Sequence, residues 1–326
     1  LVTLLPMAWG IGRAERLRVV PAGRIAVVQP GVGTEARLDP VAGWAATRRA
    51  LERLLPELEG REALLVVLPE VTLRARPGAA SPPGATEHLV GMARRLGTPV
   101  VFGALGPAAV GPGVDGAAGE AAAPLHNSAY LATRAGLAPF RYDKRRLVPG
   151  VERTPLGMDG LLPGPAGFAP GRAGPVLEVE GVRAGVLICY ESLHADLARA
   201  YRRAGADLLL NLTHDGWFGG GPGEPRTVAL AQHPAHLVLR AIETRMGVAR
   251  AAATGVSLFV DPLGRVHHPA PLATPAVRVH DPGTTEVRTA YVRWGDVAGT
   301  GSALLALLLA VTAMVRAPGP SPGAGT

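Results

Sequence analysis

Three residues suited to nucleophilic catalysis follow apolar or turn-like segments of the chain. Glu70 ends the run LLVVLPE, Cys189 lies in GVLICYE, and Lys144 follows Tyr142 at the start of the turn RRLVPG. A thiolate is a strong nucleophile once a base removes its proton or a cation lowers its pKa. A carboxylate can be that base, and an ammonium group can stabilise the oxyanion of a tetrahedral intermediate. Glu70, Lys144 and Cys189 are therefore predicted to form one catalytic site.

The scarcity of lysine and cysteine supports this prediction. Lys144 is the only lysine among 33 lysines and arginines, and Cys189 is the only cysteine. Arginine is a planar fork, whereas lysine is a compact point charge that fits beside a reacting atom. Each residue also has a simpler interpretation, because a lone cysteine is often a small buried hydrophobic residue and Glu70 alone could begin a helix. Their joint placement favours the catalytic interpretation.

The composition narrows the classes of partner. A chain of 326 residues can bury a large core, and its formal charge of +7 suits an anionic membrane surface or nucleic acid. Aromatic residues make up 4% and no basic stripe is interleaved with them, so no nucleic-acid partner is predicted. One cysteine excludes an internal disulfide and a multi-cysteine metal site, and His267 and His268 have no partner at metal-ligand spacing. No metal or other cofactor is expected.

Both ends of the chain are apolar. Residues 297–315 contain no charged residue and would form a helix of about 28 Å, close to the ~30 Å hydrocarbon core of a bilayer. Tyr291 and Trp294 precede this segment and Arg316 follows it, as interfacial anchors do. A buried core helix of this length would normally show a polar face, so a transmembrane helix is predicted. The first twelve residues, LVTLLPMAWGIG, resemble the end of a membrane helix whose beginning is missing.

Apolar runs typical of buried strands alternate with segments of helical spacing. This alternation predicts an α/β domain with its chemistry at the strand ends. The expected strands are 24–29, 63–68, 99–102, 128–133, 181–190, 207–211, 250–253, 257–260 and 287–292. The expected helices are 41–58, 88–96, 193–204 and 228–245, and 104–124 is expected to be an exposed loop. The predicted domains are an apolar N-terminal segment (1–20), a catalytic domain (21–292), a transmembrane helix (293–316) and a disordered tail (317–326).

With these motifs in view, the chain resembles the nitrilase, or carbon–nitrogen hydrolase, superfamily over residues 24–292. Within that superfamily it is most similar to the apolipoprotein N-acyltransferase family. The matching segments are YDKRRLVPGVERTPL (142–156), ICYES (188–192), NLTHDGWFG (211–219), QH with RAIETR (232–245) and TGVSLFVDPLGRV (254–266). The resemblance implies a four-layer α-β-β-α sandwich of the nitrilase type, with a C-terminal transmembrane helix.

The resemblance also implies a reaction and a location. Cys189 would attack an acyl ester of a phospholipid, with Glu70 as the base, to give a thioester and a lysophospholipid. The free α-amine of the diacylglyceryl-cysteine of a lipoprotein would then take the acyl chain, and Lys144 would stabilise the oxyanion in both steps. The enzyme would need no cofactor and would lie in the bacterial cytoplasmic (inner) membrane, with its catalytic domain on the periplasmic, outer face.

Further residues match the family pattern. Glu152 is expected to support Lys144 and the nucleophile. Tyr190 and Glu191 match the family's CYE sequence, and because successive strand-end side chains point in opposite directions, only one of them is expected to face the site. Trp217 and Phe218 lie in a glycine-rich segment and could be core residues, but a glycine-flanked aromatic pair in a loop is better interpreted as a mobile arm that touches lipid.

Two departures from the family pattern leave alternatives open. His214 stands where the family has an asparagine before Asp215, and Ala253 ends RAAA where the family has an RATN-type segment. One alternative is an amidase or nitrilase-type hydrolase in which water resolves the thioester, and the triad by itself cannot distinguish it from an acyltransferase. Another is a non-catalytic, membrane-anchored partner, which the intact triad argues against. The apolar C-terminal helix and the aromatic arm favour acyl transfer.

Overall fold

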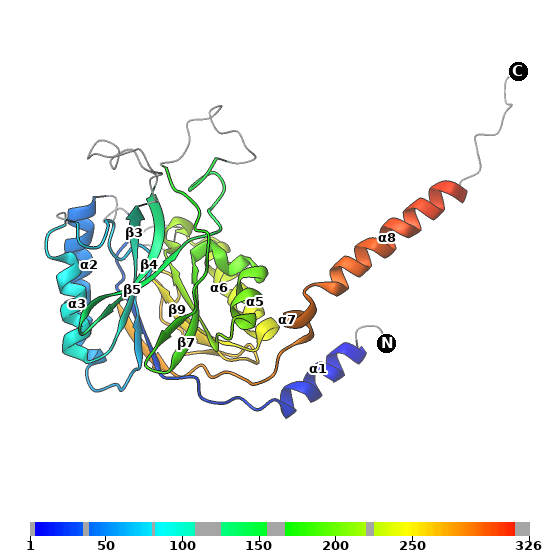
Figure 1. Ribbon diagram of the computed structural model, residues 1–326, viewed down its shortest axis with the longest axis horizontal. Helices are drawn as coiled ribbons and strands as arrows, with labels where there is room; N and C mark the ends of the chain where they lie inside the picture. Colours follow the sequence, from blue (N-terminus) through cyan, green and yellow to red (C-terminus); the bar gives the residue numbers. More distant parts are fainter. Residues whose placement is uncertain are drawn as a thin grey trace, which may run out of the picture.

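Two six-stranded sheets form the centre of the molecule (Figure 1). The computed structural model describes residues 4–34, 39–79, 82–107, 125–154, 167–219 and 225–316. The first sheet has the order β12 (Ala276–His280), β1 (Ile25–Gln29), β2 (Leu65–Val67), β3 (Val100–Pro107), β4 (Leu125–Thr133) and β5 (Gly136–Asp143). The second has the order β11 (Val266–His267), β10 (Leu258–Val260), β9 (Gly247–Ala252), β8 (Leu208–Thr213), β7 (Val182–Ile188) and β6 (Leu177–Val179).

Each sheet is mixed, with a parallel centre. Strands β1, β2 and β3 run parallel, as do β7, β8 and β9, and their neighbours on both sides are antiparallel. The helices in the described residues are α1 (Leu4–Arg16), α2 (Pro40–Leu58), α3 (Ala85–Leu96), α5 (Ala195–Arg203), α6 (Ala229–Thr244), α7 (Ala290–Trp294) and α8 (Val297–Arg316). Two short 3₁₀ helices, η3 (Cys189–Leu193) and η4 (Asp215–Phe218), follow β7 and β8.

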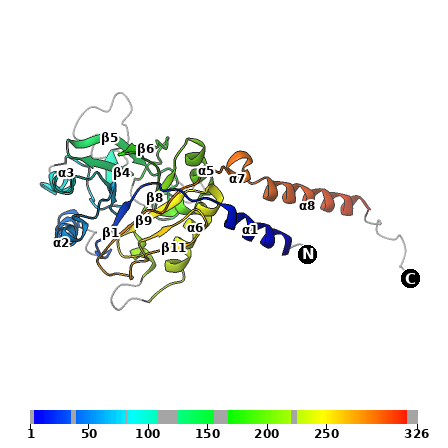
Figure 2. The same cartoon turned by 90° about the horizontal axis from the view of Figure 1, so that it is seen from below.

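Alternate residues of the central strands enter different parts of the core. In β1, Ile25 and Val27 pack toward the second sheet, whereas Ala26 and Val28 pack with residues of α2 and α3. The pictures agree, since α2 and α3 lie beside the first sheet and α5 and α6 beside the second (Figures 1 and 2). Because both faces of each parallel centre are covered, these strands are continuous apolar runs without alternation.

Close backbone packing brings α5 onto the second sheet. A Cβ atom at Gly185 in β7 would lie 2.3 Å from Cγ of Tyr201 in α5, so only glycine allows this approach. On the other side of the fold, helix α2 begins with an N-cap. The carboxylate of Asp39 accepts hydrogen bonds from the backbone N–H groups of Val41 and Ala42.

The structure corrects several expected elements. The strand expected at 287–292 is wrong: Thr289 caps a short helix there, accepting a hydrogen bond from the N–H of Val292. The loop expected at 104–124 is wrong for 104–107, which belong to β3, and 108–124 lie outside the described residues, as does the tail 317–326. Strands β5, β6, β11 and β12 were not expected, because they are short or mix polar with apolar residues.

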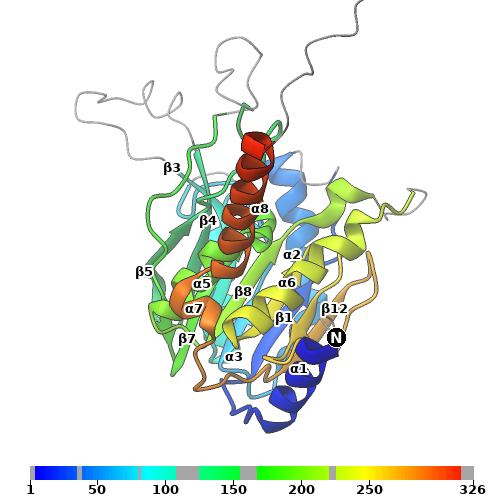
Figure 3. The same cartoon turned by 90° about the vertical axis from the view of Figure 1, so that its right-hand side faces the viewer.

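Helix α8 projects away from the domain, and α1 extends in the same direction (Figures 1 and 2). None of the residues of α8 is buried. Among the described residues it is the one helix long and apolar enough to cross a membrane. Figure 3, viewed from this end, shows α8 and α1 in front of the domain. Gly295, at a φ of 79°, separates α7 from the residues that begin α8.

Candidate active site

The three predicted catalytic residues all follow the carboxyl ends of strands. Lys144 comes directly after β5, Cys189 directly after β7, and Glu70 three residues after β2. Strands β2 and β5 belong to the first sheet and β7 to the second. The candidate site therefore lies where the two sheets meet at one edge.

The side chain of Lys144 lies between two carboxylates. Its Nζ atom is 3.2 Å from Oε1 of Glu70 and 2.9 Å from Oε1 of Glu152. Asn127 of β4 donates from Nδ2 to the same two oxygen atoms, at 2.7 Å and 3.1 Å. The four side chains are buried and hydrogen-bonded to one another, so their positions depend on each other.

Lys144 is held in its charged form. The side chain is only 1% exposed, and burial by itself lowers the pKa of an ammonium group. The negative charges of the carboxylates of Glu70 and Glu152 outweigh this effect and raise the pKa of Lys144 above its ordinary value. A charged ammonium group is therefore available at the site at neutral pH.

Glu152 reaches Lys144 because the chain turns back on itself. The backbone N–H of Glu152 donates to the carbonyl of Val148, and the N–H of Val148 donates to Oε2 of Glu152 at 2.9 Å. Gly150 in this turn has a φ of 78°, which suits glycine. The LVPGVE segment is therefore a compact loop that presents one carboxylate to the lysine.

Cys189 occupies a strained position. It is the first residue of η3 and has a φ of 51°, a conformation that residues other than glycine rarely adopt. Burial and the nearby charges of Glu70 and Asp215 raise the pKa of the thiol, whereas Lys144 and Thr213 lower it, and the net result is a pKa of about 12. The resting thiol is thus protonated at neutral pH and needs a base, and Glu70 is the carboxylate whose charge acts most strongly on it.

Glu191 ties the cysteine turn to the lysine turn. Its carboxylate accepts hydrogen bonds from the hydroxyl of Tyr142, from the N–H groups of Arg145 and Arg146, and from the N–H of Ile188. Burial raises the pKa of Glu191 above its ordinary value, although these hydrogen bonds oppose the shift. The two turns that carry Lys144 and Cys189 are consequently joined by one buried side chain.

Tyr190 does not share this role. Its ring packs edge-on against His194, with the ring centres 5.0 Å apart, and it is partly exposed. Tyr190 and Glu191 lie in the 3₁₀ helix η3. They do not occupy successive positions of a strand, as the expectation that their side chains point in opposite directions had assumed.

The two residues of the aromatic pair differ in exposure: Trp217 is exposed and Phe218 is partly buried. Trp217 is 61% exposed and lies edge-on to His214, while Phe218 lies edge-on to the buried His233.

The structure also shows the contacts of the two residues that depart from the family pattern. His214 contacts the hydroxyl of Thr34 through Nε2 at 3.0 Å. Ala253, the other, is fully buried, and its backbone pairs with Thr213 and Gly31.

Several buried polar residues near the site did not emerge from the sequence as candidates: Asn127, Tyr142, Asn211, Asp215, His233 and Arg250. The sequence feature that could have revealed some of them is a single polar residue inside an apolar strand, such as Asn211 in LLLNLT or Arg250 in GVARAA. In an arginine-rich chain, Arg250 does not stand out. No group of three or more His, Cys, Asp or Glu side chains within the described ranges is arranged to hold a metal ion.

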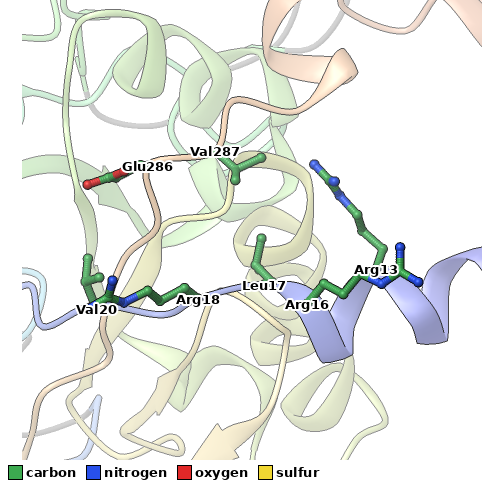
Figure 4. Close-up of a pocket in the computed structure, with 7 residues that line it drawn as sticks. All are labelled: Arg13, Arg16, Leu17, Arg18, Val20, Glu286 and Val287. Carbon is green, nitrogen blue, oxygen red and sulfur yellow. The ribbon is translucent and has the colours of Figure 1, made fainter.

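A separate cavity of about 320 Å³ lies at the base of α1 (Figure 4). It contains none of the candidate catalytic residues. Arg13, Arg16 and Arg18 line it, together with Leu17, Val20, Glu286 and Val287. The cavity lining carries three positive charges and one negative charge, so the cavity suits a ligand with an anionic group.

Comparison with known proteins agrees with this geometry. The model of the carbon-nitrogen hydrolase family matches residues 24–281. An apolipoprotein N-acyltransferase of Geobacter metallireducens is 37% identical over 176 residues, which cover 52% of this chain and 33% of that protein. An apolipoprotein N-acyltransferase of Brucella melitensis is 32% identical over 324 residues, covering 94% of this chain and 56% of that protein.

Solved structures show the same fold. An amidase from Nesterenkonia sp. superposes with a TM-score of 0.55 at 21% identity, covering 89% of this chain and 98% of the amidase. The aligned part of the chain spans between a third and just over half of the length of the two N-acyltransferases.

Proposed function

Because the chain belongs to the carbon–nitrogen hydrolase family, we propose that it is an apolipoprotein N-acyltransferase. It takes an acyl chain from a phospholipid and transfers it to the α-amine of a diacylglyceryl-cysteine at the start of a lipoprotein. The observation that carries the proposal is the buried cluster of Lys144, Glu70 and Glu152 beside the strained Cys189. The similarity to the N-acyltransferases of Geobacter metallireducens and Brucella melitensis supports acyl transfer over hydrolysis.

The first half of the reaction forms a thioester. Glu70 takes the proton from the thiol of Cys189, and the thiolate attacks the ester carbonyl of the phospholipid. The oxyanion that forms is stabilised by the ammonium group of Lys144. When the intermediate collapses, the C–O bond breaks, and the leaving oxygen takes the proton from Glu70 to give a lysophospholipid.

The second half returns the enzyme to its starting state. The neutral α-amine attacks the thioester carbonyl, and Lys144 again faces the oxyanion. Glu70 accepts a proton from the attacking nitrogen, the C–S bond breaks, and the thiolate of Cys189 recovers that proton. An amide bond has formed and no cofactor is needed.

We assign supporting roles to the neighbouring residues. Glu152 keeps Lys144 oriented and charged, because it shares the ammonium group with Glu70. Glu191 holds the two turns at a constant spacing. Trp217 supplies an exposed apolar surface beside the site, which suits contact with lipid. Tyr190 packs outside this cluster and is assigned no chemical role.

The membrane placement is part of the proposal. Helix α8 would cross the bacterial cytoplasmic (inner) membrane, with the catalytic domain on the periplasmic face. The arginine-lined cavity at the base of α1 then lies at the level of the phospholipid head groups. The domain would have the four-layer α-β-β-α sandwich of the nitrilase type, which the two core clusters support.

The decisive experiment measures the intact mass of the detergent-solubilised protein after incubation with phospholipid, with Cys189→Ala as the control. The proposal expects an acyl adduct on the wild type alone that hydroxylamine removes. Addition of a diacylglyceryl-cysteine peptide should then discharge the adduct and acylate the peptide amine. Release of free fatty acid with the peptide left unmodified would identify a hydrolase, and absence of any adduct would overturn the thioester mechanism.

A further inference from the structure

A second buried network lies behind the nucleophile. His233 of α6 contacts the backbone carbonyl of Cys189 through Nε2 at 3.1 Å and Oδ1 of Asp215 through Nδ1 at 2.9 Å. Arg250 of β9 pairs with Oδ2 of Asp215 and with Oδ1 of Asn211. All four side chains are buried, and none of them takes part in the reaction steps described above.

The chemistry of the partners determines how His233 is oriented. A backbone carbonyl only accepts hydrogen bonds, so Nε2 of His233 must carry a hydrogen atom and donate it to Cys189. Asp215 is kept ionised, because Arg250, with His233 and Thr213, lowers its pKa although burial alone would raise it. Nδ1 of His233 lies 2.9 Å from Oδ1 of this carboxylate and 3.3 Å from Nη2 of Arg250, so these two groups hold the ring in its orientation.

The bonded carbonyl belongs to a residue whose backbone needs support. At a φ of 51°, Cys189 adopts a conformation that persists only where the surrounding structure holds it. Because a peptide bond is planar, anchoring the carbonyl of Cys189 also sets the direction of the N–H of Tyr190. On the adjacent strand, Asn211 donates to the carbonyl of Leu187, so the same network holds β7 two residues before the cysteine.

We propose that His233 is a positioning residue for the nucleophile: its Nε2–H bond to the Cys189 carbonyl holds the thiol beside Lys144 and Glu70, and Asp215 and Arg250 orient the ring. The ring of Phe218 packs against His233, with ring centres 5.6 Å apart, and closes the network on the side of the aromatic arm. His233 acts on the formation and breakdown of the thioester and not on lipid binding. This inference rests on the proposed function only where turnover is measured.

Two substitutions at one position separate the two hydrogen bonds of the ring. In His233→Gln the amide nitrogen can replace Nε2 and keep the bond to Cys189. In His233→Asn the shorter amide can replace Nδ1 and keep the bond to Asp215, but it cannot reach Cys189. His236→Gln, one turn along the same helix and partly exposed, is the matched control.

The main readout needs no acyl substrate. Because Cys189 is the only cysteine, the pH dependence of iodoacetamide alkylation, followed by intact mass, reports on this thiol alone. In the Asn variant the thiol is no longer held beside Lys144 and Glu70 in its buried position. The pH midpoint of its alkylation should therefore fall by at least one unit, toward the ordinary range of cysteine. The Gln variant and the control should keep the wild-type midpoint. In acyl transfer, the Asn variant should lose at least tenfold in kcat with little change in KM for phospholipid.

Equal alkylation midpoints in the Asn, Gln and wild-type proteins would overturn the proposal, whatever the outcome for acyl transfer. If the Asn variant keeps the wild-type midpoint and the thioester assay fails, both the role of His233 and the proposed acyltransferase function are rejected. If the midpoint shifts and the thioester assay fails, only the acyltransferase function is rejected. The wild type offers a check that needs no folded Asn variant. Its ¹⁵N-histidine spectrum should contain a slowly exchanging Nε2–H signal that is lost in His233→Phe or His233→Gln, and a wild type without any such signal would also reject the bond.

Discussion

At the scale of single residues, the charge state of Cys189 depends on two neighbours of opposite sign. Burial raises the pKa of the thiol most, the charge of Glu70 raises it further, and the charge of Lys144 lowers it. Lys144 is itself enclosed by Glu70 and Glu152, in a space where its compact ammonium group contacts both carboxylates. An arginine there would place a larger planar group against the same atoms.

The two neighbours should therefore have opposite effects on alkylation of Cys189. Glu70→Gln removes a charge that raises the pKa of the thiol, so more thiolate is present at pH 9 and alkylation becomes faster than in the wild type. Lys144→Gln removes a charge that lowers this pKa, so alkylation at pH 9 becomes slower. Both substitutions should reduce acyl transfer by a factor of about 100 or more, because each removes a group that acts on the reacting atoms.

Rates of alkylation against pH from 7 to 11, measured by intact mass, test this pair. Glu178→Gln is the control, since Glu178 forms an exposed ion pair with Arg183 far along the strand from the site. A change of the same sign in both variants would show that the charges do not act on the thiol as described.

At the scale of elements, the turn that carries Glu70 rests directly on β3. The N–H of Gly103 donates to the carbonyl of Pro69, and the carbonyl of Gly103 accepts from the N–H of Leu73. Val71 in this turn has a φ of 47°, as unusual for a β-branched residue as the conformation of Cys189. Both strained turns follow parallel strands and carry a residue of the candidate site.

Gly103→Ala should disturb the turn of Glu70. A Cβ atom at this position would lie 2.5 Å from the N atom of Val71 and 2.7 Å from the Cα atom of Glu70, so backbone must move. We expect a loss of about 1–3 kcal/mol in the free energy of unfolding, as for other overpacked sites, and a fall in kcat of about tenfold or more because Glu70 is displaced.

Gly91→Ala is the matched control for this prediction. A Cβ atom there meets nothing within 4 Å on helix α3, so the substitution should stabilise the protein by about 0.5–1 kcal/mol and leave acyl transfer unchanged. Denaturant unfolding and acyl-transfer rates on both variants provide the comparison. A Gly103→Ala protein with wild-type kcat would show that Glu70 does not depend on this contact.

At the scale of the whole molecule, two helices with exposed apolar residues and an arginine-lined cavity lie toward one end. Helix α8 is unburied along its length, and α1 extends from the same end of the domain with Met7, Trp9 and Ile11 exposed. The arginine-lined cavity lies between this end and the domain. Such a distribution matches a protein that inserts apolar helices into a bilayer and keeps its basic residues at the head-group level.

Leu308→Arg should weaken membrane association. An arginine near the middle of a membrane helix costs about 2.5–3.5 kcal/mol on the insertion scale, which corresponds to a loss of roughly 100-fold in partitioning. Ala298→Arg places the same group near the end of α8, where its side chain can reach the interface, and should have little effect. Flotation with liposomes that contain anionic phospholipid measures both, and equal flotation of the two variants would argue against a spanning α8.

Much of the fold and of the candidate site could be predicted because the signals are local. Most parallel strands are apolar runs, α8 is uniformly apolar, Glu70 and Cys189 each follow a strand end, and Lys144 begins a turn. Strands such as β12, with its sequence AVRVH, could not be predicted from local pattern, because their existence depends on pairing with a strand far away, here β1. The strand predicted at 287–292 is wrong for a different reason: Thr289 caps a short helix there by accepting a hydrogen bond from the N–H of Val292.

The sequence by itself determined the chemical groups of this protein and the order in which strand ends present them, because residue type and apolar periodicity are written along the chain. Only the tertiary structure decided which groups share a proton or a charge. The bond between Asn127 and Glu70, the bridging role of Glu191 and the bond between His233 and Cys189 join residues from different elements. Such contacts depend on how two sheets and a helix pack in space, and distance along the chain carries no information about them.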